Sequence, residues 1–280
     1  MRATLRARLG LSVVGIALAI GGVAAAPEAS AAERPRPLVA LGDSYSSGEA
    51  NPPFDPAAPG CDRSPNAWPV LAAALLGRPA VNLACSGAQT KDVVNPYKGQ
   101  PAQVDALKAV RPRPRIVTIT IGGNDAGFST VLGACVATDC VESGAVARGE
   151  VTILTVLPER LVRTYRAVRK AAPGAKLVVV GYPRLFPRRQ ADVTGCPWLT
   201  SAERKALNAA GDLLNLEIRL AARRAGARYV DVSNTLAGHE LCTQDSWIFP
   251  IGVGPAPQYW AHPILPGQQA IAARVAAALS

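Results

Sequence analysis

Five short apolar segments separated by helical patterns constrain the fold of this chain more than any other feature. Each segment is rich in Val, Ile or Leu and is bounded by Gly, Pro or Asn, as β-strands are. The segments are residues 38–42, 80–84, 115–121, 176–181 and 227–232. Apolar strands that alternate with helices are typical of a parallel sheet covered on both faces. The sequence therefore predicts an α/β fold, a three-layer α/β/α arrangement with a five-stranded parallel sheet, in one domain.

Helical patterns lie between and after these strands. Apolar side chains recur at helical spacing at Leu157, Leu161, Tyr165 and Val168, and the pattern stops at a Pro-Gly pair. The expected helices cover residues 68–76, 103–110, 153–172, 201–224 and 266–279. Long segments rich in Pro and Gly are expected to be loops at one rim of the sheet; they are residues 51–66, 133–144, 184–199 and 238–258.

The N-terminal 32 residues have the pattern of a secretory signal peptide. Three arginines precede an apolar stretch over residues 9–26, and Ala29-Ser30-Ala31 forms an Ala-x-Ala cleavage site. A membrane anchor is the alternative, since the stretch approaches the roughly 20 residues that span a bilayer. The stretch is rich in glycine and alanine and is followed by small residues, and these features favour a cleaved signal peptide over an anchor. We expect residues 1–32 to be removed and residues 33–280 to form one secreted, extracellular domain, a monomer without stable insertion into membranes.

The chain contains an even number of cysteines, which indicates three disulfides in a protein destined for an oxidising compartment. They are Cys61, Cys85, Cys135, Cys140, Cys196 and Cys242. A zinc site is the alternative, but the chain has no Cys-x-x-Cys and neither histidine lies near another ligand in sequence. We therefore expect no metal. Spacing alone leaves the connectivity of the disulfides open.

Basic residues exceed acidic ones, with 30 Lys and Arg against 20 Asp and Glu and a net charge of +10. The basic side chains are scattered or form short clusters, without the interleaved aromatic residues typical of nucleic-acid binding. We therefore expect no nucleic-acid partner. A weak attraction to anionic lipid or cell-wall polymer is the minor alternative.

A serine that closely follows the first strand is the best candidate for a nucleophile. Gly42 lets the chain turn, so Ser44 is expected at the carboxyl edge of the sheet, where open α/β sheets place their sites. Gly87 and Asn124 follow the second and third strands and reach the same edge. A glycine N–H and a side-chain amide are suitable donors for the oxyanion of acyl transfer.

The base that acyl transfer by serine requires must be one of the chain's two histidines. His262 is the better candidate, because His239 is expected to be a loop residue beside Cys242. The chain has no Gly-x-Ser-x-Gly elbow, which disfavours the α/β-hydrolase arrangement. It also lacks clustered His and carboxylate ligands, which disfavours a metal-dependent hydrolase.

Four blocks in order resemble those of the SGNH, or GDSL, hydrolase family. They are Gly-Asp-Ser-Tyr-Ser-Ser-Gly at 42–48, the turn at Gly87, Gly-Gly-Asn-Asp at 122–125 and His-Pro at 262–263. The resemblance covers roughly residues 38–278 and is strongest to the secreted, three-disulfide lipases and esterases of actinomycetes. It implies a flavodoxin-like five-stranded sheet flanked by helices.

The resemblance also implies a role for each matching residue. Ser44 would be the nucleophile and His262 the general base and then acid. The oxyanion hole would comprise the N–H groups of Ser44 and Gly87 and the side chain of Asn124. The cysteines would pair in sequence order, Cys61 with Cys85, Cys135 with Cys140, and Cys196 with Cys242.

One position departs from the family pattern. Many members have an aspartate three residues before the histidine, where this chain has Tyr259. The nearest upstream carboxylate is that of Asp245. We expect a backbone carbonyl of Tyr259 or Trp260 to accept the Nδ1–H of His262, which gives a Ser-His dyad.

Together these observations predict a secreted carboxylic ester hydrolase, a lipase or esterase that cleaves fatty-acyl esters of small molecules or lipids. The reaction is expected to pass through an acyl-enzyme and to need no cofactor. One alternative is a deacetylase of acetylated polysaccharide: a small, polar acyl pocket would favour it, whereas an apolar groove beside Ser44 would favour the lipase. A non-catalytic carbohydrate- or lipid-binding protein is a third reading, disfavoured because the nucleophile, base and oxyanion donors are all present.

Overall fold

A computed structural model describes residues 10, 35–189, 193–252 and 256–280 of the chain. Residues 35–280 form one compact unit. The predicted signal peptide lies outside the described residues apart from Gly10, and its cleavage stays a prediction.

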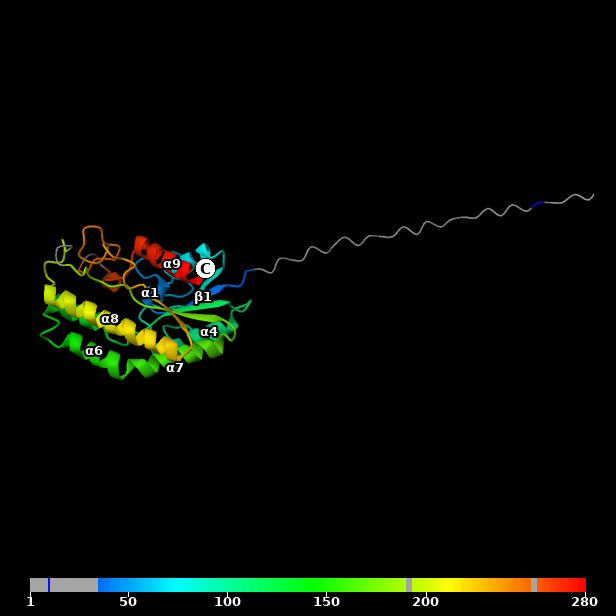
Figure 1. The fold of residues 1–280 in the computed structure, drawn as a ribbon, viewed down its shortest axis with the longest axis horizontal. Coiled ribbons are helices and arrows are strands. Elements are labelled where there is room, and N and C mark those ends of the chain that lie inside the picture. Colours follow the sequence, from blue (N-terminus) through cyan, green and yellow to red (C-terminus); the bar gives the residue numbers. More distant parts are fainter. Residues whose placement is uncertain (1–9, 11–34, 190–192, 253–255) are drawn as a thin grey trace, which may run out of the picture. The chain divides into compact units, whose positions relative to one another are not determined.

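Five parallel strands form the sheet, in the spatial order β2-β1-β3-β4-β5. Figure 1 shows the strands as arrows, with β1 labelled. Every neighbouring pair is parallel. The strands are β1 (Leu38–Gly42), β2 (Ala80–Asn82), β3 (Ile116–Thr120), β4 (Lys176–Val180) and β5 (Arg228–Val230). The predicted α/β fold is thereby confirmed. From β1 the chain passes to one side to form β2 and then returns to the other side as β3, so the carboxyl end of β1 lies at a topological switch point.

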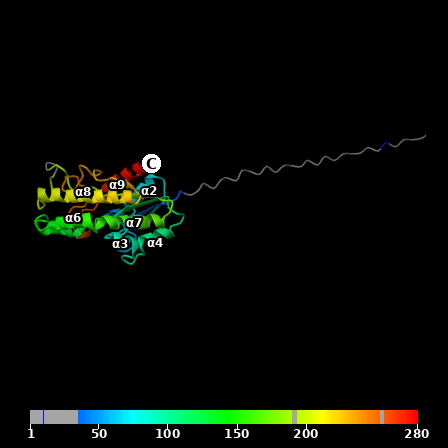
Figure 2. The ribbon, with the colours of Figure 1, turned by 60° about the horizontal axis from the view of Figure 1, so that its bottom comes forward.

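Helices cover both faces of the sheet, because the side chains of each strand alternate between two buried clusters. Val39 and Leu41 pack in one cluster with α3 (Thr90–Val94), α4 (Gln103–Ala109), α7 (Leu157–Ala171) and the second half of α8 (Ser201–Arg224). Leu38 packs in the other with α2 (Trp68–Leu75) and α9 (Leu265–Leu279). Figure 2 shows α3, α4 and α7 on the side opposite α2 and α9.

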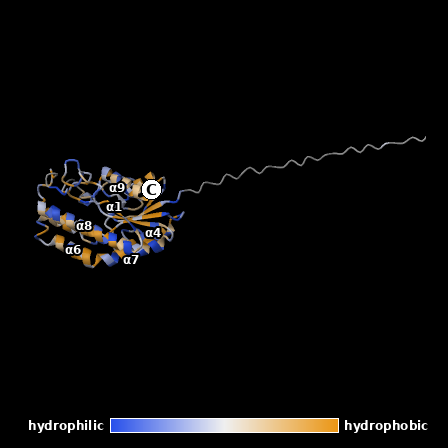
Figure 3. Ribbon diagram, viewed as in Figure 1, coloured by the Kyte–Doolittle hydropathy of each residue, from blue (hydrophilic) through white to orange (hydrophobic). Residues whose placement is uncertain are grey.

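The strands are predominantly hydrophobic, whereas helices such as α7 have both hydrophobic and hydrophilic residues (Figure 3). Every residue of β1 and β3 is buried, which explains why both strands are mostly apolar; the two threonines of β3 are buried as well. Helix α7 is amphipathic: it buries Leu157, Leu161 and Tyr165 and carries its arginines on the other face.

The helix predicted over residues 153–172 is wrong, because the structure has two helices there. Helix α6 (Ala145–Thr155) ends before Val156, and α7 starts at Leu157 with Pro158 in its first turn. A proline is tolerated at a helix start but breaks a helix interior, since it lacks an N–H and crowds the preceding turn. Pro158 therefore fixes the boundary that the apolar periodicity conceals.

The loop predicted over residues 133–144 is wrong in its first part. Helix α5 (Phe128–Ala137) runs through Gly133, and α6 begins directly after Gly144. The Ala, Val and Leu residues around Gly133 outweigh the roughly 1 kcal/mol that one glycine costs in a helix interior.

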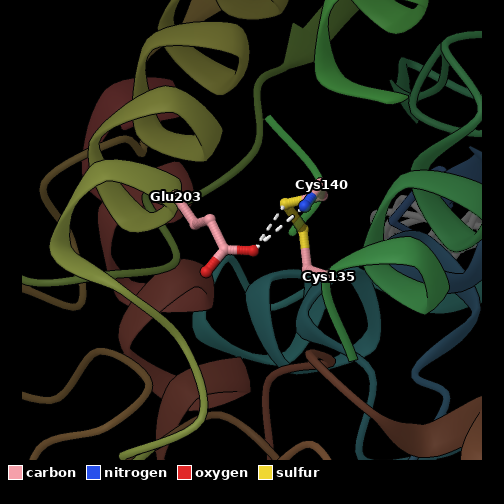
Figure 4. A group of neighbouring side chains, drawn as sticks. All are labelled: Cys135, Cys140 and Glu203. Atoms are coloured by element: carbon pink, nitrogen blue, oxygen red, sulfur yellow. Dashed lines mark hydrogen bonds between the residues drawn. A yellow bond between two sulfur atoms is a disulfide. The ribbon is translucent and has the colours of Figure 1, made fainter. Parts of the chain in front are cut away.

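Three disulfides are present in the structure: Cys61–Cys85, Cys135–Cys140 and Cys196–Cys242. This is the sequence-order pairing that the family resemblance implies. Glu203, in the first turn of α8, accepts a hydrogen bond from the backbone N–H of Cys140 at 3.1 Å (Figure 4). It also completes the capping box of α8 with Thr200. The group of Cys135, Cys140 and Glu203 thus joins α5 to α8, and its sulfurs are not free thiolates.

Within the described part of the chain, none of the helices has both the length and the apolar composition needed to cross a bilayer.

Candidate active site

A sharp turn after β1 places Ser44 at the start of the short helix α1 (Ser44–Ser47). Gly42 has a φ of +122°, and a Cβ there would lie 2.1 Å from the carbonyl oxygen of Thr120, so only glycine fits. Asp43 then caps the helix by accepting the N–H of Tyr45 at 3.1 Å. Local sequence therefore fixes the direction of the Ser44 side chain at the sheet edge.

The second oxygen of the Asp43 carboxylate accepts a hydrogen bond from the hydroxyl of Tyr182. The same hydroxyl accepts the N–H of Gly123 at 2.9 Å. Burial raises the pKa of Asp43 to about 7, against the lowering effect of its hydrogen bonds to Tyr182 and Tyr45. Tyr182 therefore ties the turn before Ser44 to the turn before Asn124.

His262 lies against Ser44, with 2.7 Å between its Nε2 and the serine Oγ. Two hydrogen bonds from the chain near Ser44 hold the histidine loop: the Tyr45 hydroxyl donates to the carbonyl of Ala261 at 2.6 Å, and the Asn51 amide donates to that of Pro263 at 2.9 Å. The predicted nucleophile and base, 218 residues apart, are thereby brought together.

Backbone carbonyls face the other nitrogen of His262. Nδ1 lies 3.3 Å from the carbonyl oxygen of Tyr259, one of the two residues predicted to orient the ring. Burial lowers the pKa of His262 to about 4, while hydrogen bonding to the backbone of Tyr259, Trp260 and Gln258 acts in the opposite direction. The ring is therefore neutral near pH 7, and its Nε2 is free to accept a proton.

The candidate oxyanion donors lie in two connected turns. Gly87 has a φ of +78°, and no hydrogen bond among the described residues uses its N–H. The side-chain amide of Asn124 donates to the carbonyl of Ala88, beside Gly87, at 3.0 Å. Ser44, as the first residue of α1, has an N–H without an intrahelical acceptor. These are the three groups that the resemblance implies for the oxyanion hole.

The second histidine belongs to another part of the molecule. His239 stacks on Trp247 with ring centroids 3.6 Å apart, and its Nδ1 lies 3.0 Å from a carboxylate oxygen of Asp245. Asp245 is thus the partner of His239, and its side chain is 75% exposed.

An acidic residue that the sequence analysis missed lies beside the dyad. Glu49 follows Gly48, which ends α1 at a φ of 90°. A carboxylate oxygen of Glu49 lies 3.6 Å from Nε2 of His262 and accepts the hydroxyl of Ser86 at 2.5 Å. Burial raises the pKa of Glu49 to about 7. No motif in the sequence points to Glu49, and only the folded chain places it near the histidine.

A pocket opens beside Ser44 and Asn124 and extends between α5, α6 and α8. Its lining away from these two residues is mostly apolar, and includes Phe128, Val131, Val146, Ile153, Leu207 and Leu214. Gly149 and Gly211 form part of the wall where α6 and α8 face it.

Comparison with known proteins agrees with this site and fold. Residues 40–270 match the GDSL-like lipase/acylhydrolase family. A lipase of Streptomyces rimosus is 35% identical over 254 residues, which cover 90% of this chain and 89% of that protein. Lipase 1 of Streptomyces coelicolor is 36% identical over 84% of this chain and 82% of its own length.

Two solved structures resemble the whole fold. The phospholipase A1 of Streptomyces albidoflavus has a TM-score of 0.75 and 36% identity, covering 88% of this chain and 99% of the other. The extracellular lipase of Streptomyces rimosus has a TM-score of 0.75 and 34% identity, covering 87% and 99%. By sequence and fold, this chain belongs to the GDSL-like lipase/acylhydrolase family.

Proposed function

We propose that this lipase/esterase hydrolyses fatty-acyl esters through an acyl-enzyme formed on Ser44. Nε2 of His262 takes the proton of the Ser44 hydroxyl as Oγ attacks the ester carbonyl, and it then gives that proton to the departing alcohol. A water molecule, activated by the same nitrogen, releases the carboxylic acid and restores Ser44. The 2.7 Å contact between the two side chains and the neutral state of the ring support this sequence.

The N–H groups of Ser44 and Gly87 and the amide of Asn124 stabilise the negative charge on the tetrahedral intermediate. The unused N–H of Gly87 and the hydrogen bond from Asn124 to Ala88 support this role, because they hold donors ready before the substrate binds. Backbone carbonyls at Tyr259 and Trp260 orient His262, as the contacts around Nδ1 support.

The apolar pocket beside Ser44 is the observation that carries the assignment of substrate class. A fatty-acyl chain gains about 0.8 kcal/mol for each methylene that it buries in such a pocket. An acetyl group would leave the side chains of α5, α6 and α8 without contact. Fatty-acyl esters of lipids are therefore the proposed substrates in preference to acetylated polysaccharide.

We further propose that the protein acts outside the cell. The three disulfides and the N-terminal signal-peptide pattern support export, and the Streptomyces rimosus relative is described as an extracellular lipase.

Hydrolysis of p-nitrophenyl acetate, butyrate, octanoate and palmitate by the mature protein tests this function. The wild type should favour the longer chains, and Ser44→Ala and His262→Ala should each lose at least about 1000-fold in kcat. His239→Ala is the matched control and should keep its activity, because His239 lies with Asp245 and Trp247. Turnover of acetate alone would favour a deacetylase. Unchanged activity in both site variants would exclude the proposed dyad.

A further inference from the structure

The catalytic histidine of the proposed mechanism has no carboxylate on its Nδ1 side. Tyr259 occupies the position where many members of the family have an aspartate, and its carbonyl oxygen lies 3.3 Å from Nδ1. A carbonyl dipole fixes the tautomer, but it stabilises a positive ring less than a full negative charge does.

A carboxylate is nevertheless present, on the opposite side of the ring. One oxygen of Glu49 lies 3.6 Å from Nε2 of His262, and the two side chains are only 3% and 9% exposed. Water therefore screens the charges little, and an ion pair between them would be much stronger than one on the surface.

The surroundings of Glu49 hold its carboxylate in place. Its backbone N–H donates to the carbonyl of Ser44 at 3.2 Å, and the Ser86 hydroxyl donates to the side chain at 2.5 Å. Ser86 is in turn fixed by Lys98, whose ammonium donates to the Ser86 carbonyl at 2.9 Å. The residue before Ser86, Cys85, is bonded to Cys61.

The charged and titratable groups that act on this pair come from several segments. The carboxyl of Asp43, whose pKa burial raises to about 7, repels a negative charge on Glu49. Lys98 favours the ionised form of Glu49, whereas Asp62 and burial oppose it. The ring of Tyr45 lies 5.1 Å from that of His262, and its phenol donates to the Ala261 carbonyl. The phenol of Tyr259 lies within the electrostatic influence of both Glu49 and Asp62.

We propose that Glu49 is a positioning residue for His262, whose carboxylate stabilises the imidazolium formed when the histidine takes the Ser44 proton. This inference rests on the proposed acyl-enzyme mechanism. No proton passes to Glu49 in the step: the proton moves from Ser44 Oγ to His262 Nε2, and the negative charge beside Nε2 balances the charge that the ring acquires. Glu49 thus supplies from the nucleophile's own loop the charge that Tyr259 does not supply.

Steady-state kinetics of Glu49→Gln on a soluble short-chain ester, between about pH 5 and pH 9, test the proposal. Glutamine keeps the shape of the side chain and an oxygen for the Ser86 hydroxyl, but removes the charge. We expect kcat to fall about 10- to 100-fold with KM changed less than about twofold, because the charge acts on the transition state. Glu49→Asp, which restores the charge at a longer distance, should recover part of the loss.

The pH profile separates this role from a purely structural one. Burial raises the pKa of Glu49 to about 7, so wild-type kcat should rise with pH through neutrality as the carboxylate ionises. Glu49→Gln should lose the part of this rise that Glu49 causes and keep only what Asp43, whose pKa is also about 7, contributes. Ser86→Ala should move it to higher pH, because the Ser86 hydrogen bond lowers the pKa of Glu49. Asp245→Asn, at an exposed carboxylate that pairs with His239, should keep the wild-type profile.

A second measurement does not depend on activity. The chain has two histidines, so NMR can distinguish the ring signals of His262 from those of His239. In the wild type, the His262 signals should shift twice, once near neutral pH as Glu49 ionises and again at lower pH as the ring protonates. In Glu49→Gln the neutral shift should shrink to what Asp43 contributes, and the second shift should remain.

Three results would each overturn the proposal. The first is a kcat of Glu49→Gln equal to that of the wild type, and the second is an unchanged rise of kcat through neutral pH in that variant. The third is the absence of a shift of the wild-type His262 signals near neutral pH. Failure of the acyl-enzyme mechanism itself would be visible separately, as activity that survives Ser44→Ala.

Discussion

Gly211 provides a direct test of the acyl pocket. It lies within α8 and lines the pocket, and a Cβ added there would have no heavy atom within 4 Å. A side chain at this position therefore meets open space rather than packed protein. Gly211→Leu should project into the volume that we assign to the acyl chain, without displacing the helix.

The size of the effect follows from the number of methylenes displaced. The four carbons of a leucine side chain occupy the space of about four methylenes, each worth about 0.8 kcal/mol when buried. The loss for a long acyl chain is therefore about 3 kcal/mol, or about 200-fold in kcat/KM. The acetyl group ends near Ser44 and should lose less than about threefold.

The assay compares kcat/KM for p-nitrophenyl acetate and octanoate in wild type, Gly211→Leu and Gly211→Ala. The alanine variant is the matched control: it adds one carbon and should change the octanoate-to-acetate ratio by less than about fivefold. Because alanine replaces a glycine within a helix, it should also stabilise the protein by about 1 kcal/mol, or about 2–4 °C in Tm. An equal loss on both esters in Gly211→Leu, or no loss on either, would show that the acyl chain lies elsewhere.

Two further predictions concern stability and can be measured by thermal denaturation. Tyr182→Phe removes the hydroxyl that bonds both the Asp43 carboxylate and the Gly123 N–H. Because two buried polar groups lose a hydrogen bond, the free energy of unfolding should fall by about 3 kcal/mol and Tm by about 6–12 °C. A change in Tm under about 2 °C would contradict this. Replacing Cys196 and Cys242 together by serine removes a crosslink between residues 46 apart in sequence. The free energy of unfolding should fall by up to about 4 kcal/mol, because the unfolded chain gains entropy. An unchanged Tm would contradict the constraint that we assign to this disulfide.

The strand pattern was sufficient to predict the sheet because its residues are buried on both sides. Val39 and Leu41 face one layer of helices and Leu38 the other, so the apolar run has to be continuous. The helix boundary at Val156 could have been predicted from Pro158. Helix α5, by contrast, runs through Gly133, because the apolar residues around this glycine outweigh its helix-breaking signal.

The local parts of the site were predictable from motifs, whereas its long-range contacts were not. Ser44 and Asn124 follow strands whose ends meet at one edge, so their proximity is a property of parallel topology. The contact of Glu49 with His262 depends on a turn at Gly48, on the Ser86 hydroxyl and on a loop more than 200 residues away in sequence. No spacing rule connects these three elements.

The buried acids near Ser44 lower the free energy of unfolding when they are ionised. The pKa of Glu49 is raised by burial from 4.5 to about 7, so its favourable contribution is complete below pH 4.5 and is lost as the pH rises through 7. Above pH 7 this loss amounts to about 3 kcal/mol. The cost falls in the region where the Cys61–Cys85 disulfide fixes the chain next to Ser86 and Gly87. The disulfide limits the freedom of the unfolded chain in this segment, so it offsets part of the free energy that the buried charge of Glu49 costs.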